Sequence, residues 1–260
     1  AAARASQARS AGAAYSLFRT PRLGMSALID ALVAALEGVD LQRGVSATGL
    51  IRRGEGWRVE TSQGSLDVDA VVPALPSAAT ARLLTDVHPA LAEDLGAIRA
   101  ASAATVNLVW PADRVQHPLD GFGFVVPAAE GRFCMAATFT QRKYAGRCPD
   151  DRVLIRAFAG GALGPEVGAM NDAQVLEGAL GDMKALLSID TQPLHALVTR
   201  YPQRQPQFEL GHGARVARIE AAEAELPGLA LAGNCFSGVG VADCILRAQR
   251  AVAHVEPFLA

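Results

Sequence analysis

The stretch with the clearest capacity for chemistry is a glycine-rich turn near the C-terminus, residues 233–240. An apolar run from Leu229 to Ala232 precedes it, and Gly238, Val239 and Gly240 lead from it into a helical pattern. A strand, a glycine turn and a helix N-terminus together offer backbone N–H groups to a phosphate or to a polarised ring. The sequence therefore predicts a ligand-facing turn, and the alternative is a turn that only caps the helix.

The same turn falls short of a dinucleotide-binding fingerprint. In Gly238-x-Gly240-x-x-Asp243 an aspartate stands where the third glycine of G-x-G-x-x-G belongs. We interpret Asp243 as a helix N-cap rather than a ligand contact. Three other glycine pairs also lack the third glycine and the following helix; they begin at Gly54, Gly121 and Gly211.

The residue pattern does not support nucleophilic, acid/base or metal-dependent catalysis. The sequence has neither a Gly-x-Ser-x-Gly elbow nor a convincing acid/base pair. We interpret His212 as a structural hydrogen-bonding residue rather than a proton shuttle. The cysteines form no C-x-x-C pair and have no histidine at metal-ligand spacing; they are Cys134, Cys148, Cys235 and Cys244. We expect no metal site, no catalytic side chain, and buried thiols in a reducing compartment.

Composition argues against two broad classes of protein. Half of the 260 residues are hydrophobic, 5% are aromatic, and the formal net charge is −2. A nucleic-acid binder usually carries a basic excess, so no nucleic acid is expected as a partner. No apolar run approaches the ~20 residues of a membrane span. Residues 1–14, interpreted as a tail or helix remnant, lack the apolar block of a secretory signal. We expect a cytoplasmic protein, soluble or attached to the membrane surface.

Apolar spacing predicts the elements that would position the turn. Between Met25 and Leu36 apolar residues recur at helical spacing, and Gly38 ends the pattern. Further helices are predicted over 77–84 with Ser77 as cap, 89–95, 172–187 with Asn171 or Asp172 as cap, 214–224, and from Val241 onward. A β-meander is predicted over 45–72, and its chain continues into an apolar strand over 69–76.

Strands dominate the middle of the chain. They are predicted over 15–18, 105–110, 122–126, 134–139, 153–158 and 194–201, and residues 202–206 are predicted to form a loop. This spacing favours a mostly antiparallel sheet. The expected fold class is α/β plus α+β, with two intertwined parts: residues 15–77 and 226–260 form one α/β layer, and residues 78–225 form the second sheet with its helices.

Five segments, in this order, resemble the protoporphyrinogen oxidase family, FAD-dependent enzymes with the flavin amine oxidase fold. They are Thr20-Pro-Arg-Leu-Gly-Met-Ser-Ala-Leu28, Asp69-Ala-Val-Val-Pro-Ala-Leu-Pro76, Gly121-Phe-Gly-Phe-Val-Val-Pro127, Pro206-Gln-Phe-Glu-Leu-Gly-His212 and Leu231-Ala-Gly-Asn-Cys-Phe-Ser-Gly-Val-Gly-Val-Ala-Asp-Cys-Ile245. One departure is large, because family members open with a strand and a G-x-G-x-x-G turn that this chain lacks. The resemblance therefore covers about the C-terminal half to 60% of a family member, and the chain is expected to be a truncated form.

The resemblance implies FAD as cofactor, a porphyrinogen as substrate and O₂ as electron acceptor, in haem biosynthesis. It makes residues 15–77 and 226–260 a partial FAD-binding domain with an incomplete Rossmann-like layer, and residues 78–225 the substrate-binding domain. The residues implied to meet the flavin are Ala47, Tyr201, Gly233, Gly238, Val239, Gly240 and Val241. Ala47 matches a position at the adenine end, and Tyr201 takes the place of a tryptophan, with an ordinary strand aromatic as the alternative.

The resemblance also implies a substrate pocket. Its residues would be Phe122, Gly123, Val125, Thr138, Phe139 and Phe158; the alternative is that the phenylalanines belong to the core. Strict alternation along a strand sends Phe122 and Val125 to opposite faces. A bulge or kink at Gly123 is therefore required if both line one pocket.

Other interpretations stay open. One is another flavin oxidoreductase of the amine oxidase fold, such as a carotenoid desaturase. Another is a non-catalytic fragment that binds a hydrophobic ligand or partner, because phosphate contacts normally supply much of the dinucleotide affinity. The sequence does not separate protoporphyrinogen IX from coproporphyrinogen III and leaves a homodimer open. Membrane contact is expected only through the missing N-terminal part.

Overall fold

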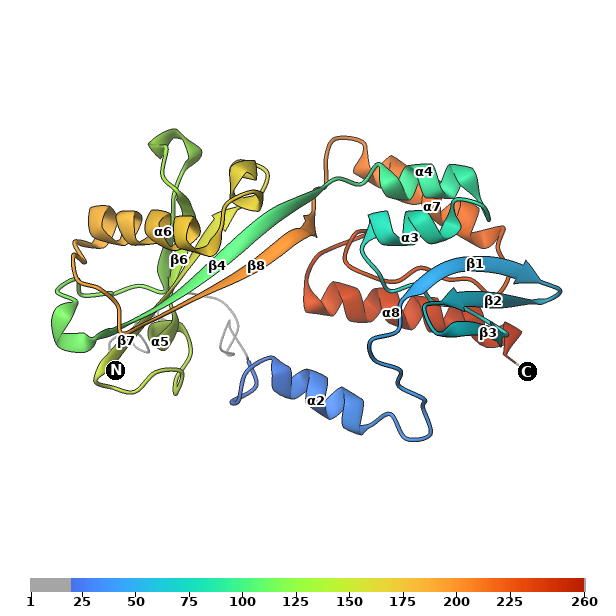
Figure 1. Cartoon of the computed structure of the whole chain (residues 1–260), viewed down its shortest axis with the longest axis horizontal. Coiled ribbons are helices and arrows are strands. Elements are labelled where there is room, and N and C mark those ends of the chain that lie inside the picture. The colour runs from blue at the N-terminus through green and yellow to red at the C-terminus, as the bar shows by residue number, and fades with distance from the viewer. Residues whose placement is uncertain (1–19, 260) are drawn as a thin grey trace, which may run out of the picture. The chain divides into compact units, whose positions relative to one another are not determined.

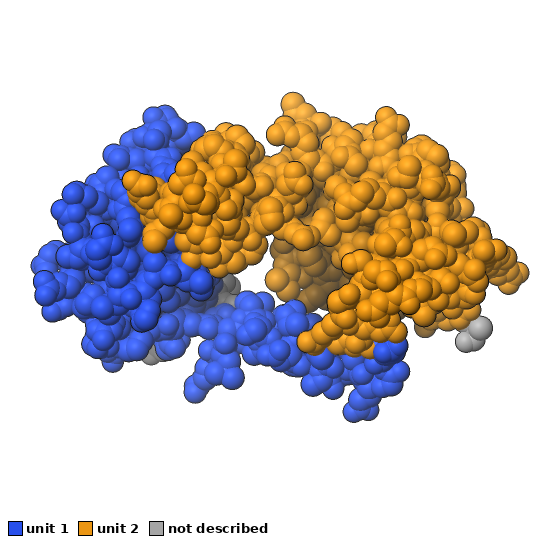
Figure 2. All heavy atoms as spheres, in the orientation of Figure 1, with its two compact units in different colours: residues 1–40, 106–157, 179–197 blue, residues 41–105, 158–178, 198–260 orange. Residues whose placement is uncertain are grey.

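The structure, a computed structural model, describes residues 20–259. The tail predicted over 1–14 and the strand predicted over 15–18 lie outside these residues. The chain divides into two compact units, which Figure 2 shows in different colours. Unit 1 consists of residues 1–40, 106–157 and 179–197, and unit 2 consists of residues 41–105, 158–178 and 198–260.

The predicted β-meander is present in unit 2 (Figure 1). Strands β1 (Ala47–Arg53), β2 (Gly56–Thr61) and β3 (Gly64–Val68) pair antiparallel in the order β1-β2-β3. Trp57 on β2 is fully buried, and its indole Nε1–H donates a hydrogen bond to the carbonyl of Pro227 at 3.0 Å. This bond ties the meander to the segment that leads into the glycine turn.

The apolar strand predicted over 69–76 is shorter than expected. It forms a single parallel bridge, between Val71 and Leu229. The N–H groups of Ala230 and Ala232 donate to the carbonyls of Val71 and Pro73, at 3.1 and 3.2 Å. Prolines have no N–H to give to a ladder, which explains why the pairing ends at this point.

Four helices complete unit 2: α3 (Ser77–Leu84), α4 (Pro89–Gly96), α7 (His212–Ala224) and α8 (Val241–Val255). Their core residues include Leu84, Leu91, Leu95 and Ile219. The prediction that Ser77 caps α3 is wrong: Ser77 is the first helical residue and follows Pro76 as N-cap. Its hydroxyl donates instead to the carbonyl of Ile98 at 3.4 Å.

A five-stranded sheet has the order β5-β6-β7-β4-β8. Its strands are β4 (Ala100–Pro111), β5 (Gly123–Val125), β6 (Cys134–Phe139), β7 (Arg152–Gly160) and β8 (His195–Pro206). Strands β5 and β6 are antiparallel. Bonds from Ala112 N–H to Asp151 O and from Gly161 N–H to Ser102 O show that β4 and β7 are also antiparallel.

Strand β8 extends through residues 202–206, which were predicted to form a loop, so that prediction is wrong. Pro202 and Pro206 had suggested a break. β8 is the last strand of the sheet, and an edge strand tolerates proline better than a central strand because only one of its sides pairs with a neighbour.

Helix α6 (Asp172–Leu187) matches its prediction, and a short helix α5 (Thr140–Lys143) was not predicted. The cap of α6 is Asn171, whose side-chain oxygen accepts a hydrogen bond from Gln174 N–H at 3.0 Å. The Gln174 side chain in turn accepts from Asn171 N–H at 2.9 Å. This reciprocal pair is a capping box.

Helix α2 (Ser26–Ala34) confirms the most regular helical pattern of the sequence, but none of its residues is buried. Ile29 and Leu32 are 58% and 56% exposed. Over residues 20–259 no helix is long and apolar enough to cross a membrane.

Helices α4 and α7 are joined by an ion pair between Asp94 and Arg218, with Arg218 Nε 2.9 Å from Asp94 Oδ2 and a second, shorter contact from Nη2 to Oδ1. The hydrogen bonds from Arg218 hold the pKa of Asp94 below its ordinary value. A carboxyl whose folded pKa is depressed stabilises the fold above the ordinary pKa of about 3.9 and loses that effect as the pH falls through the depressed value.

Replacing Asp94 with asparagine is expected to lower the unfolding free energy by about 1 kcal/mol near pH 7, since the pair lies close to solvent. The difference from wild type should shrink as the pH falls below about 3.9 and disappear once the pH lies below the depressed pKa of Asp94. Urea unfolding at a series of pH values measures this. Glu93→Gln, exposed on the same helix, is the matched control; an Asp94→Asn deficit that stays constant with pH would contradict the assignment.

Candidate functional site

The strand predicted over 229–232 is reduced to a single bridge at Leu229, and the glycine turn leaves this buried segment and becomes exposed at its tip. Residues 229–231 are fully buried, and Cys235 and Phe236 are 2% and 3% exposed. Val239 and Val241, by contrast, are 57% and 54% exposed. The turn is therefore anchored at its base and presents its tip, at the N-terminus of α8, outward from unit 2.

A side chain at position 238 would collide with the side chain of Asp243 as it lies in the structure. A Cβ at Gly238 would lie 2.3 Å from Asp243 Oδ2, which is shorter than any real contact of that kind. The same oxygen accepts a hydrogen bond from Gly240 N–H at 3.1 Å. Asp243 is thus the third helical residue, bonded back to the N-cap Gly240, and the prediction that it is itself the N-cap is wrong.

Helix α8 turns its apolar stripe away from the rest of unit 2. Val241, Ile245 and Val252 recur at helical spacing and are 54%, 51% and 58% exposed. The inward face carries Arg247 together with Ala251 and Val255, and the arginine is only 6% exposed. Sequence periodicity alone would have turned Val241, Ile245 and Val252 inward as well.

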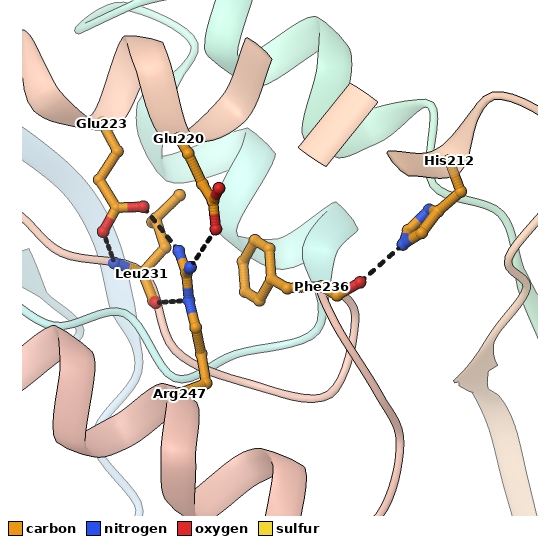
Figure 3. A network of polar contacts seen from close by, with 6 residues as sticks. All are labelled: His212, Glu220, Glu223, Leu231, Phe236 and Arg247. Carbon is orange, nitrogen blue, oxygen red and sulfur yellow. Dashed lines mark hydrogen bonds and ion pairs between the residues drawn. The ribbon is translucent and has the colours of Figure 1, made fainter. Parts of the chain in front are cut away.

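Arg247 is enclosed by a polar network, drawn in Figure 3. Its guanidinium donates to Glu220 Oε1 and Glu223 Oε2, both at 2.7 Å, and to the carbonyl of Leu231 at 2.8 Å. Glu223 Oε1 accepts from Leu231 N–H at 3.0 Å. The guanidinium also lies over the ring of Phe236, 4.4 Å from the centroid.

These contacts satisfy the backbone groups along one edge of the buried segment 229–232. Ala230 and Ala232 bond to the segment at Val71, so the backbone groups of Leu231 point to the opposite edge. There Glu223 and Arg247 take the positions that a further strand would occupy. Side chains thus satisfy an otherwise open strand edge at the base of the turn.

The other residues implied for the flavin lie elsewhere in unit 2. Ala47 is exposed at the start of β1, opposite Thr61, next to an irregularity in the pairing. Tyr201 lies on β8 and is 42% exposed. In the part of the chain that the structure describes, no hydrogen bond joins either residue to the glycine turn, so the structure groups only Gly233 and residues 238–241.

A pocket in unit 1 contains three of the residues implied for the substrate. It has a volume of ≈ 430 Å³ and is lined by Gly123, Val125 and Phe139, among others. Phe124 meets Phe139 edge to face, with ring centroids 6.1 Å apart. The walls of this pocket are mainly apolar, as an aromatic ligand requires.

Gly123 makes the close approach between β5 and β6 possible. It pairs with Thr138, and its φ of +140° places it outside the region that other residues readily adopt. A Cβ there would lie 2.0 Å from the carbonyl oxygen of Ala137. The register is unbroken on both sides of Gly123, so the expected bulge is absent, and Phe122 does not line the pocket with Val125.

The remaining implied substrate residues have separate surroundings. Phe122 is 38% exposed, and its carbonyl accepts from Phe139 N–H at 3.0 Å. Thr138 is half-buried opposite Gly123, and neither Phe122 nor Thr138 lines the pocket. Phe158 is half-buried on β7 and belongs to unit 2.

The cysteines of residues 20–259 are free thiols. Cys134 and Cys235 are buried as expected, whereas Cys148 and Cys244 are only partly buried. Burial raises the pKa of Cys235 to about 11. Burial and the neighbouring Asp182 carboxylate also raise the pKa of Cys134. Both thiols therefore stay protonated at neutral pH and are poor nucleophiles. No cluster of metal-ligating side chains occurs in the described part of the chain.

Sequence reasoning missed residues at both places. In the pocket these are His117, Asp120, Phe124, Leu186 and Leu187, and at the turn they are Glu220, Glu223 and Arg247. The pocket residues come from separate segments, and no local pattern links them. The sequence offered one signal: Arg247 lies four residues before Ala251, so the two side chains lie on the same face of α8, which is the buried one.

The family model described as flavin-containing amine oxidoreductase matches residues 6–256. The coproporphyrinogen III oxidase of Bacillus subtilis is 30% identical over 244 residues, which are 93% of this chain and 52% of that protein. The corresponding protein of Propionibacterium freudenreichii is 36% identical over 94% of this chain and 46% of its own length. Human protoporphyrinogen oxidase is 32% identical over 90% and 50%. The chain spans about half the length of these relatives.

Two solved structures share the fold of this chain over most of its length. A structure from Exiguobacterium sp., provisionally assigned as a protoporphyrinogen oxidase, superposes with a TM-score of 0.82 at 26% identity, over 92% of this chain and 52% of that one. A putrescine oxidase variant superposes with a TM-score of 0.70 at 14% identity, over 90% and 53%, which shows the fold alone. The mixed α/β structure with antiparallel sheets thus matches the flavin amine oxidase fold over about half its length. The chain belongs to the flavin-containing amine oxidoreductase family, and its homologues are protoporphyrinogen and coproporphyrinogen oxidases.

Proposed function

We propose that this chain contributes the C-terminal part of an FAD-dependent porphyrinogen oxidase of haem biosynthesis. The reaction is oxidation of protoporphyrinogen IX or coproporphyrinogen III to the porphyrin, with O₂ as electron acceptor. The observation that carries the proposal is the similarity to enzymes of both names over at least nine-tenths of the chain. In this proposal residues 15–77 and 226–260 belong to the FAD-binding domain, with its Rossmann-like layer, and residues 78–225 to the substrate-binding domain.

The tip of the glycine turn fits a flat, neutral ring better than a phosphate. The first N–H groups of α8 have no acceptor within the helix, and the neighbouring glycines leave the backbone open. The carboxylate of Asp243 lies against Gly238 and Gly240, where it already meets the positive end of the helix. A phosphate at this position would face that negative charge, so the polarised edge of an isoalloxazine is the better occupant.

In this proposal the residues implied for the flavin have separate roles. The backbone of Val239, Gly240 and Val241 would lie against the isoalloxazine, and Gly233 and Gly238 would shape the turn. Ala47 would meet the adenine end through its main chain, and Tyr201 would lie near the ring system. When bound, FAD would supply the redox chemistry of the proposed oxidation, with O₂ as the final electron acceptor. No nucleophilic or metal-bound group is needed from this chain.

The unit 1 pocket suits part of a porphyrinogen, a large ring with apolar faces. Gly123, Val125 and Phe139 offer apolar contact there, and Phe122, Thr138 and Phe158 are proposed to meet the same substrate. These side chains would orient the macrocycle and exclude water, which is what a cofactor-driven oxidation requires of the protein.

A chimera tests the proposal: the N-terminal half of the Propionibacterium freudenreichii relative is joined ahead of this chain. We expect a yellow protein that keeps its flavin absorbance after desalting and produces porphyrin fluorescence from a porphyrinogen. Val239→Glu, which puts a charge on the exposed tip of the turn, is expected to weaken FAD binding about tenfold or more, since an unpaired carboxylate would be desolvated against the ring. Leu66→Glu, on the exposed side of β3, is the matched control.

Two other results would contradict parts of the proposal. A soluble chimera that holds no flavin would contradict the cofactor assignment. A yellow chimera that oxidises an amine or desaturates a polyene, but leaves both porphyrinogens unchanged, would move the chain to another activity of the same fold.

A further inference from the structure

The turn over residues 233–240 is held just before its start and in its middle by side chains that the proposed chemistry does not use. Just before its start, Arg247 donates to Leu231 O and Glu223 accepts from Leu231 N–H. In its middle, His212 Nε2 lies 2.8 Å from the carbonyl oxygen of Phe236. Figure 3 shows these contacts converging on the segment from α7 and α8.

Arg247 acts here as a structural brace. Its two terminal nitrogens bond to Glu220 and Glu223, and its Nε bonds to Leu231 O. Three of its five N–H groups are engaged in these bonds, and the two carboxylates offset its positive charge, which disfavours an anionic ligand at this position. The guanidinium plane also supports the ring of Phe236 at 4.4 Å. A single side chain thus fixes both the strand that enters the turn and the aromatic residue within it.

His212 holds the opposite side of the turn. A carbonyl oxygen only accepts hydrogen bonds, so Nε2 must carry the proton in this contact. The imidazole stacks on Phe208, with centroids 4.1 Å apart and planes 10° from parallel. Its Nδ1 is buried and has no partner among residues 20–259. The ring is therefore oriented by stacking and by its one bond to the turn.

We propose that Arg247 and His212 are positioning residues that set the conformation of the turn and, through it, the affinity for the flavin ring. The inference rests on the proposed function for its flavin part alone, since the bracing contacts lie within unit 2. Neither side chain is placed against the ligand: each acts through the backbone of Leu231 or Phe236.

Hydrogen exchange on the flavin-free chain tests the positioning itself. In Arg247→Lys and His212→Leu we expect amides of residues 233–240 to exchange about tenfold faster or more, while β1–β3 amides keep their wild-type rates. His212→Gln, whose amide reaches the position of Nε2, should restore slow exchange. Arg250→Lys, exposed on the same helix, is the control. Unchanged exchange in the turn, or a uniform rise across unit 2, would overturn the proposal.

FAD titration of the chimera and its variants tests the flavin part. Arg247→Lys and His212→Leu should weaken FAD binding about tenfold and shift the flavin absorbance bands, and His212→Gln should recover both. Equal affinity and equal spectra in all variants would overturn a role in flavin binding. A chimera that binds no FAD even with the wild-type turn would instead contradict the proposed function, and the exchange result would still decide the positioning.

Discussion

Replacing Gly123 with alanine is expected to lower the unfolding free energy of the protein by on the order of 3 kcal/mol, from strained φ and overpacking together. The alanine Cβ would lie 2.0 Å from the carbonyl oxygen of Ala137 and 2.8 Å from the Cα of Thr138. Both obstacles are backbone atoms of β6 and cannot rotate aside. Relief requires β5 to move away from β6, which opens the wall of the unit 1 pocket.

Gly131→Ala separates the two causes of this loss. Gly131 also has a positive φ, +58°, but no atom lies within 4 Å of a Cβ built there. This variant should lose only about 1 kcal/mol, the conformational part. Urea unfolding in a Trp57→Phe background, where Trp110 is the remaining tryptophan, reports on unit 1. If Gly123→Ala costs no more than Gly131→Ala, the close approach of β5 and β6 is wrong.

Replacing Arg247 with methionine should cost about 3–5 kcal/mol of unfolding free energy, because it leaves a buried carboxylate without its cation. Glu223 is 8% exposed and would keep one bond, from Leu231 N–H. The carbonyl of Leu231 would lose its donor as well. Denaturant unfolding followed by circular dichroism measures the loss, and Arg250→Met on the exposed side of α8 is the matched control.

Two further measurements separate this cause from simple loss of packing. Adding Glu223→Gln to Arg247→Met removes the buried charge, so the double variant should be more stable than Arg247→Met alone. An unpaired buried carboxylate has a raised pKa in the folded state, so its cost is present at high pH and relieved as the pH falls below that value. A deficit in Arg247→Met that neither acid nor the second substitution reduces would show that the charge is not its cause.

Much of the secondary structure was predictable because its signals are local. The meander over 45–72, the helices over 77–84 and 172–187, and the strand over 134–139 follow from alternation, helical spacing and turn residues, and the structure contains all four. The errors have nonlocal causes. Residues 202–206 join a strand because β8 lies at a sheet edge, a position that two prolines do not reveal.

The candidate site likewise combines a local feature that the sequence shows with nonlocal contacts that it does not show. The turn at 233–240 was visible in the sequence because glycine spacing between a strand and a helix is a local pattern. The contacts that hold it were not visible, because Arg247 meets Glu220, Glu223 and Leu231 across 16 to 27 residues of chain. The unit 1 pocket likewise joins β5 to the end of α6. The residues assigned to flavin and substrate remain predictions within the proposed function.

By itself the sequence determined the family, the order of most elements and the glycine turn, since each depends on residues close together in the chain. Only the tertiary structure decided which face of α8 is buried, why position 123 must be glycine, and which side chains brace the turn. The physical reason is that burial and close approach depend on what the rest of the fold places against a residue. Helical spacing on α8 predicts that its apolar stripe is buried. In the structure Arg247 is buried, because Glu220, Glu223 and the carbonyl of Leu231 accept its hydrogen bonds.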